Sequence, residues 1–231
     1  MKTLSTTLIL LLSCLPCISQ DIHFSFAERN PLVLNPAFAG ANYKKEATLN
    51  YRNQWSSLGD PITTTTLGFH SRITAERRNS GNTLAIGIQF TNDKAGNPRI
   101  TGNTISAIIA DHIQLSRESK IGAALKIVYG QRAIRAQEGQ WATQFNGTTY
   151  DPSIGSGEAF ETAEFRYLDV GAGLLYTYKR KGRIFSQSDT RIINAGISGY
   201  HLNRPNNSFF TENTDKLPVR WSAFASAEIG I

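Results

Sequence analysis

Hydrophobic and polar residues alternate with a period of two through most of the chain after residue 42. The clearest run places Ile121, Ala123, Leu125, Ile127 and Tyr129 on one parity. Successive side chains of a strand point to opposite faces, so each run predicts a strand with one apolar and one polar or small face. Eight strands are expected, at residues 43–55, 62–74, 82–93, 101–115, 120–133, 164–179, 190–201 and 217–231.

The predicted strands are long. Strands of globular proteins cluster near about 5–6 residues, whereas a tilted membrane-spanning strand needs about 9–11. Aromatic residues suited to interfacial girdles lie near several strand ends, among them Tyr51, Tyr129 and Tyr176. The pattern predicts an all-β protein, an antiparallel transmembrane β-barrel of about eight strands. A soluble β-sandwich or a lipocalin-like barrel would also alternate and is the alternative.

The first twenty residues predict export. Lys2 precedes an apolar stretch of residues 8–18 that is too short for a membrane helix, and small residues precede a cleavage position after Ser19. Residues 1–19 are therefore interpreted as a signal peptide; a buried strand and lipoprotein processing at Cys14 are alternatives. Both cysteines of the 231-residue chain lie in this stretch, so cleavage after Ser19 would leave no disulfide or thiolate site.

Composition adds little to this picture. Hydrophobic residues make up 40% of the chain and charged residues 18%, which argues against disorder. The formal charge is +6. Basic turns at residues 76–81 and 179–183 mark strand ends and lack a stacking platform, so no nucleic-acid partner is expected.

Residues 20–42 do not alternate. Asn30-Pro31 and Asn35-Pro36 disfavour helix before each proline, and Gly40 can take a positive φ. This non-strand segment is expected either to line the lumen or to lie beneath the barrel. The predicted organisation is a signal peptide at 1–19, the N-terminal segment at 20–42 and a β-barrel domain at 43–231.

Several motifs in this region occur together in a known family. They are Gln20-Asp21-Ile22-His23-Phe24-Ser25, Asn30-Pro31-Leu32, Leu34-Asn35-Pro36-Ala37-Phe38-Ala39-Gly40 and, in the first strand, Tyr51-Arg52-Asn53-Gln54-Trp55. In order and spacing they resemble the PorP/SprF family of type IX secretion system outer-membrane proteins. The resemblance implies about six more strands in family members, so this chain is expected to be a truncated gene, a partial sequence or a short family member, and closure of the barrel by eight strands is left open.

The resemblance implies a non-enzymatic role in the outer membrane. Such proteins assist secretion or surface attachment of cargo adhesins, in some cases with gliding motility. The implied partners are the type IX translocon, periplasmic motor-linked components, a secreted cargo adhesin and outer-membrane lipid. The residues that carry the family motif here are Asn35, Pro36, Gly40, Arg52, Asn53, Gln54 and Trp55. The last four form either a recognition patch or a lumenal polar network with one girdle tryptophan.

The longest connection, residues 134–163, is rich in aromatic side chains. Trp141, Phe145 and Tyr150 could anchor a protein partner or fold the loop back into the lumen. The sequence leaves both open. A small passive porin is the alternative function.

A search for catalytic patterns is negative. No metal-binding, nucleotide-binding or nucleophile motif occurs, so no catalytic residue, metal or cofactor is predicted. Asp111 and His112, with Ser106 or Ser116, would be needed for an outer-membrane lipid hydrolase, the least favoured alternative. The simpler interpretation makes Asp111 a polar lumenal residue and His112 a solvated one.

Overall fold

The computed structural model describes residues 29–57, 60–73, 82–96, 100–135, 139–157, 163–180, 191–210 and 215–229. Eight strands of 10–17 residues lie within these ranges. They are β1 (Lys45–Gln54), β2 (Ile62–Arg72), β3 (Asn82–Ala95), β4 (Ile100–Gln114), β5 (Ser119–Ala133), β6 (Glu164–Arg180), β7 (Arg191–Tyr200) and β8 (Arg220–Ile229). The largest difference from the predicted boundaries is at β8, which begins three residues later than expected.

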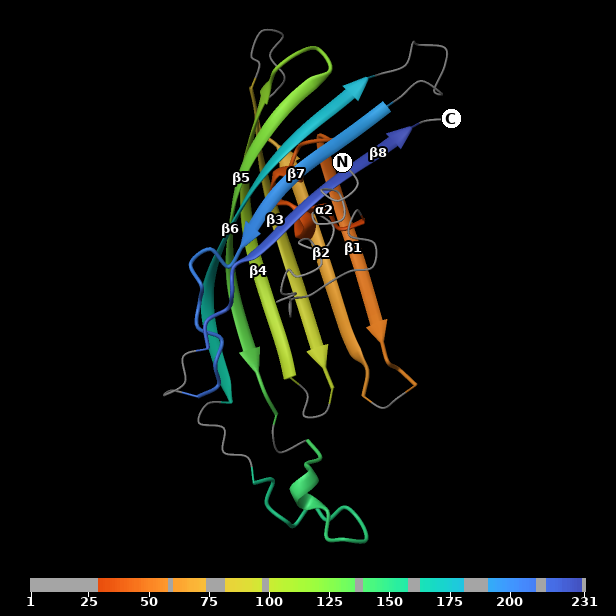
Figure 1. The fold of residues 1–231 in the computed structure, drawn as a ribbon, viewed down its shortest axis with the longest axis vertical. Coiled ribbons are helices and arrows are strands. Elements are labelled where there is room, and N and C mark those ends of the chain that lie inside the picture. The colour runs from red at the N-terminus through yellow and green to blue at the C-terminus, as the bar shows by residue number, and fades with distance from the viewer. Residues whose placement is uncertain are drawn as a thin grey trace, which may run out of the picture.

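The eight strands form one antiparallel sheet in which every strand pairs with its neighbours in sequence. Figure 1 shows that the sheet curls into a half-barrel with a concave inner face. Within the described residues, β1 and β8 are the two ends of the hydrogen-bonded order and do not pair with each other. The prediction of an all-β antiparallel fold with about eight strands is confirmed.

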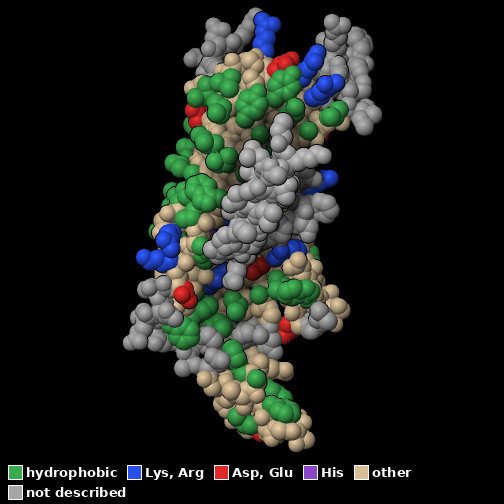
Figure 2. All heavy atoms as spheres, in the orientation of Figure 1, with side chains coloured by type: hydrophobic (Ala, Val, Ile, Leu, Met, Phe, Trp, Pro, Cys, Tyr) green, Lys and Arg blue, Asp and Glu red, His purple; other side chains and the backbone are tan. Residues whose placement is uncertain are grey.

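Burial alternates strictly along the central strands. Between Ile121 and Gly130 in β5, every odd position is exposed and every even position is buried. The exposed positions form an apolar belt on the convex face of the sheet, which includes Leu49, Leu67, Phe69, Ile86, Ile88, Phe90, Ile105, Ile109, Leu125, Ile127, Leu168, Leu174 and Ile197. Figure 2 shows such hydrophobic side chains gathered along the visible outer surface. The sheet thus turns its apolar face outward, as expected for a membrane barrel.

Helical structure in the described residues is short. It consists of α2 (Pro31–Leu34), η2 (Pro36–Phe38) and η4 (Ala142–Gln144). Among the residues described, no helix has the length and apolar character needed to cross a bilayer.

The connections differ between the two ends of the sheet. β4 and β5 are joined by a tight turn, in which the backbone N–H of Leu115 and that of Ser116 both donate to Ser119 O at 3.0 Å. At the opposite end, residues 139–157 project beyond the strand ends (Figure 1). The signal peptide, Cys14 and the basic turn at 76–81 lie outside the described residues.

Candidate functional site: the N-terminal segment and the concave face

The segment from Arg29 to Asn42, here called the plug, lies against the concave face of the sheet (Figure 1). It contributes most of the buried apolar cluster, which comprises Leu32, Ala37, Phe38, Ala39 and Ala41 with Ile108, Ala110, Ala124 and Leu175 from β4, β5 and β6. Apart from residues such as Ile108 and Leu175, side chains on the inner face of these strands are mostly small or polar, so the plug supplies much of the hydrophobic volume. Of the two expected positions, the described part of the segment occupies the lumenal one.

Asn35 fastens the plug to β6 and β7. Its side-chain amide donates to Leu174 O at 3.0 Å and to Ile197 O at 3.1 Å, while its Oδ1 accepts from the backbone N–H of Ala37 at 2.9 Å. The last bond caps η2, which Pro36 begins. All polar atoms of the amide group are therefore engaged in a site from which water is excluded, since Asn35 is fully buried.

Two glycines make room for this asparagine. A Cβ on Gly173 would lie 2.1 Å from Asn35 Oδ1, and one on Gly196 would lie 3.0 Å from Asn35 Nδ2. Neither glycine has an unusual backbone conformation, so each is explained by close approach rather than by a turn. Neither glycine was predicted to have a role. Their signal was available, because both interrupt long strands at positions where no turn is needed.

Gly40 ends the compact part of the plug with a φ of +70°. Its backbone N–H donates to His70 Nδ1 at 3.1 Å, and its carbonyl accepts from Arg72 Nε at 2.7 Å. An added Cβ would meet Ala85 Cβ at 2.5 Å. Both the positive φ and the lack of space therefore require glycine at this corner.

Side chains of the sheet bind several further carbonyls of the plug. Ser198 Oγ donates to Leu34 O at 2.8 Å, and Tyr200 OH donates to Val33 O at 2.7 Å. His112 Nε2 lies 2.7 Å from Ala39 O. Lysines from β5 and β6 contribute further bonds: Lys120 to Ala41 O, Lys126 to Leu32 O and Lys179 to Asn42 O. The plug's backbone is thus satisfied by side chains of strands distant in sequence, which holds it in one position.

The family motif Tyr51-Arg52-Asn53-Gln54-Trp55 is divided between the two faces of β1. Arg52 and Gln54 share the inner parity, whereas Tyr51 and Asn53 are exposed on the convex side. Arg52 Nη2 donates to Thr64 Oγ1 at 3.0 Å, and Thr64 donates in turn to Asp93 Oδ1 at 2.5 Å. Trp55 follows the strand at a φ of +60° with 63% of its surface exposed. These residues do not converge on one surface.

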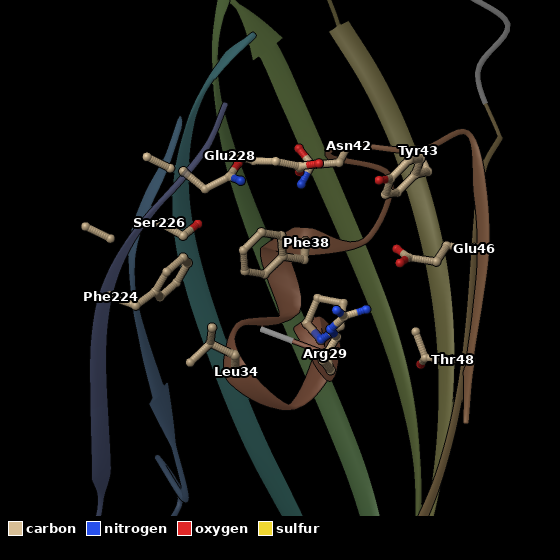
Figure 3. Close-up of a pocket in the computed structure, with 14 residues that line it drawn as sticks. Arg29, Leu34, Phe38, Asn42, Tyr43, Glu46, Thr48, Phe224, Ser226 and Glu228 are labelled. Carbon is tan, nitrogen blue, oxygen red and sulfur yellow. The ribbon is translucent and has the colours of Figure 1, made fainter. Parts of the chain in front are cut away.

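A groove of about 930 Å³ opens beside the plug, between β1 and β8. Figure 3 shows Phe38 and Phe224 close together in it, with Glu46 and Glu228 lying on separate walls. The two phenylalanine rings stack at 5.2 Å between centroids. His70 Nε2 donates to Glu46 Oε2 at 2.8 Å, because His70 Nδ1 accepts from the backbone N–H of Gly40. The groove is mixed in polarity and offers no assembled catalytic arrangement.

A second, smaller cavity of about 310 Å³ lies on the other side of the plug. Its walls include Lys126, Arg132, Asp93 and Asp169. Lys126 donates to Gln89 Oε1 at 2.6 Å, and His201 Nδ1 lies 2.8 Å from Asp169 Oδ2. Oppositely charged side chains therefore share the inner surface, which gives a polar lumen of mixed sign.

The loop of residues 139–157 is folded by its own contacts. Gln144 is buried and donates from Nε2 to Ile154 O at 3.0 Å, and Phe145 pairs with Tyr150 in an isolated antiparallel bridge. Phe145 remains 57% exposed and Tyr150 37% exposed, with Trp141 partly buried. The loop does not enter the lumen in Figure 1.

The residues of the hydrolase alternative do not come together. Asp111 is exposed on the convex face, whereas His112 faces inward with 2% of its surface exposed. The expectation of a lumenal Asp111 and a solvated His112 is therefore wrong, because neighbouring strand residues point to opposite faces and His112 is needed by the plug. Ser106 is also buried and donates to Gln89 O, not to a histidine. Among the described residues, no group of three or more His, Cys, Asp or Glu could hold a metal ion.

A comparison with known protein families identifies this sheet, which has an apolar outer face and carries the plug on its inner face. The family described as "Type IX secretion system membrane protein PorP/SprF" matches residues 17–231. The chain belongs to the PorP/SprF family. A comparison with curated proteins gave no match. The resemblance inferred from the motifs is confirmed.

Membership of the PorP/SprF family, with the β-barrel-like fold, supports a role associated with type IX secretion in the outer membrane. Within this PorP/SprF chain, the geometry separates the motif residues into two groups. Asn35, Pro36 and Gly40 build the plug, while Arg52 joins the inner polar network and Trp55 lies exposed beyond β1.

Proposed function

We propose that this PorP/SprF protein is a docking component of the type IX secretion system in the outer membrane. The apolar belt anchors it in lipid, the loop 139–157 binds the translocon or a secreted cargo adhesin outside, and the opposite end meets periplasmic motor-linked components. In this role it assists secretion or surface attachment of adhesins, including those of gliding motility. The observation that carries the proposal is the folded, aromatic loop beyond the strand ends.

The loop has the properties of a binding surface. Exposed aromatic side chains are the commonest anchors of protein interfaces, and Phe145 and Tyr150 lie side by side in their bridge. The bonds made by Gln144 hold this arrangement before a partner arrives. Such preorganisation lowers the entropy lost on binding.

The plug favours docking over a passive channel. Asn35, Ser198 and Tyr200 tie it to the sheet by short hydrogen bonds. Because the plug occupies the lumen and is held there by these bonds, it obstructs rapid diffusion of solutes. We also propose that the protein is exported to the outer membrane and that residues 1–19 are cleaved.

A pull-down from outer membranes tests the docking role. We expect the double variant Phe145→Ala/Tyr150→Ala to lower recovery of translocon components or cargo by about ten-fold or more, the loss typical of interface anchors. Thr148→Ala is the matched control, since only the backbone N–H of Thr148 bonds to Asn146 in the same turn. Surface adhesin and cell spreading should fall in parallel.

Equal recovery with Phe145→Ala/Tyr150→Ala, with the Thr148→Ala control and with the unaltered protein would contradict docking through this loop. A lone pore that conducts ions and recovers no secretion partner would support the porin alternative instead.

A further inference from the structure

One carboxylate lies inside the apolar belt. Asp111 occupies an exposed outer position of β4, between Ile109 and Ile113 on the same face. Its partners across the sheet are Leu84 in β3 and Ala123 in β5. Ile105 continues the apolar run towards one end of the strand and Leu115 towards the other. Asp111 therefore lies within the apolar belt, three residues before the end of β4.

The Asp111 carboxylate makes no hydrogen bond or ion pair with any other residue in the described ranges. An ionisable group in the hydrocarbon region is costly to leave in lipid, and such groups usually mark a functional contact. The neighbouring His112 cannot bond to the Asp111 carboxylate, because the His112 ring points into the concave face and contacts Ala39 O.

Asp111 is one of the residues that line a shallow groove of about 530 Å³. The groove extends from Leu84 in β3 to Trp221 in β8, and apart from Asp111 and Ser198 its lining is apolar. Ala123, Ala172 and Gly199 come from three adjacent strands and keep its floor low. In membranes, where lipid is as apolar as any side chain, small residues and a polar group are what distinguish a protein contact from a lipid-facing surface.

We infer that this groove holds a membrane-embedded segment of a partner protein that places one lysine or arginine side chain against Asp111. The inference rests on the outer-membrane placement proposed above. A lipid acyl chain would fill the groove but would not neutralise the Asp111 carboxylate. A basic side chain neutralises the carboxylate, and the low dielectric of the membrane strengthens their attraction. The small-residue floor allows the partner's backbone close approach.

Site-specific photo-crosslinking in native outer membranes tests the inference. The crosslinking residue p-benzoylphenylalanine replaces Leu125, a large exposed residue that lines the groove, or, as a matched control, Phe69 in β2, which is also exposed in the belt. We expect a discrete protein adduct at position 125 and lipid adducts at position 69. The captured peptide, identified by mass spectrometry, should be apolar and contain a lysine or arginine.

Changes at Asp111 provide the decisive comparison. Asp111→Asn should lower the protein adduct at position 125 by about ten-fold or more, as expected for loss of a buried charge pair, while Asp111→Glu should retain most of it. Asp111→Lys should abolish the adduct, and exchanging the mapped basic residue of the partner for Asp should restore it.

Lipid adducts alone at position 125, an adduct insensitive to Asp111→Asn, or a captured peptide without a basic residue would each overturn the inference. In all three cases the protein still fractionates with the outer membrane, so the proposed function survives. Recovery of the protein outside the outer membrane would overturn both.

Discussion

Asn35 joins three parts of the molecule through one amide group. It caps η2, holds β6 and β7 through two carbonyls, and fits only because Gly173 and Gly196 lack side chains. Burying an amide is costly unless its hydrogen bonds are made, so this side chain specifies one position of the plug. The asparagine and the glycines form a single unit although about 140 or more positions separate them in the chain.

This unit should show non-additive energetics. We expect Asn35→Ala and Gly173→Ala each to lower the free energy of unfolding by about 1–3 kcal/mol, the first by loss of buried hydrogen bonds and the second by a clash with Asn35 Oδ1. The double variant should cost less than the sum, by about 0.5–3 kcal/mol, because removing Asn35 removes the clash. Urea unfolding in lipid vesicles measures all three.

Gly155→Ala is the control for the glycine change, because a Cβ there meets no atom within 4 Å. If the effects of Asn35→Ala and Gly173→Ala on the free energy of unfolding were strictly additive, the plug would not be held by the close approach of Asn35 to Gly173.

The loop 139–157 owes its shape to short-range bonds rather than to the sheet. Asp151 accepts from both the hydroxyl and the backbone N–H of Ser153, at 2.6 and 2.9 Å. These donors favour the ionised carboxylate, so the pKa of Asp151 lies below its ordinary value, with the hydroxyl as the larger cause. The turn is consequently stabilised at pH values above the ordinary aspartate pKa.

Acidification should therefore loosen this turn. Because the folded pKa is depressed, the stabilisation is present above the ordinary value of 3.8 and is lost as the pH falls through the lower folded value. Ser153→Ala should move the pKa of Asp151 up towards 3.8, whereas Ser153→Thr, which keeps the hydroxyl, should leave it lowered. NMR titration of the Asp151 carboxyl in detergent micelles measures the shift. An unchanged midpoint in Ser153→Ala would refute the role of the hydroxyl.

The molecule as a whole is arranged with its apolar residues outside and a polar surface, covered by the plug, inside. In water this arrangement would expose a continuous apolar surface, which soluble monomers rarely do. In a bilayer the same belt faces hydrocarbon, and the backbone of every inner strand is paired to its neighbours. This fold is therefore suited to a lipid bilayer rather than to water.

A charge placed in the belt distinguishes the two environments. We expect Ile88→Lys to lower folding stability in lipid vesicles by about 2–4 kcal/mol, the cost near a bilayer midplane. Asn53→Lys, on the same convex face but at the end of β1, should cost about 0–1 kcal/mol. Changes within about 0.5 kcal/mol for both variants would instead indicate a surface exposed to water.

The alternation of side chains determined the strands and the fold class by itself. Strand geometry depends on near neighbours, so a period of two was enough to predict eight antiparallel strands and their approximate boundaries. The same parity already set Asp111 on the apolar face of β4 and His112 on the other. The prediction of a lumenal Asp111 was wrong because it followed the general preference of carboxylates for polar surroundings rather than the parity of the strand.

Only the tertiary structure decided where the N-terminal segment lies and why particular residues are needed. Prolines predicted that residues 30–38 would leave the strand pattern, but they carry no information on which surface receives the segment. That position depends on contacts such as Asn35 with Ile197, 162 positions apart, and on the space left by Gly173. Such contacts exist only after the sheet has curled. The same long-range closure gathered the belt residues into one surface and left Asp111 in a groove within it.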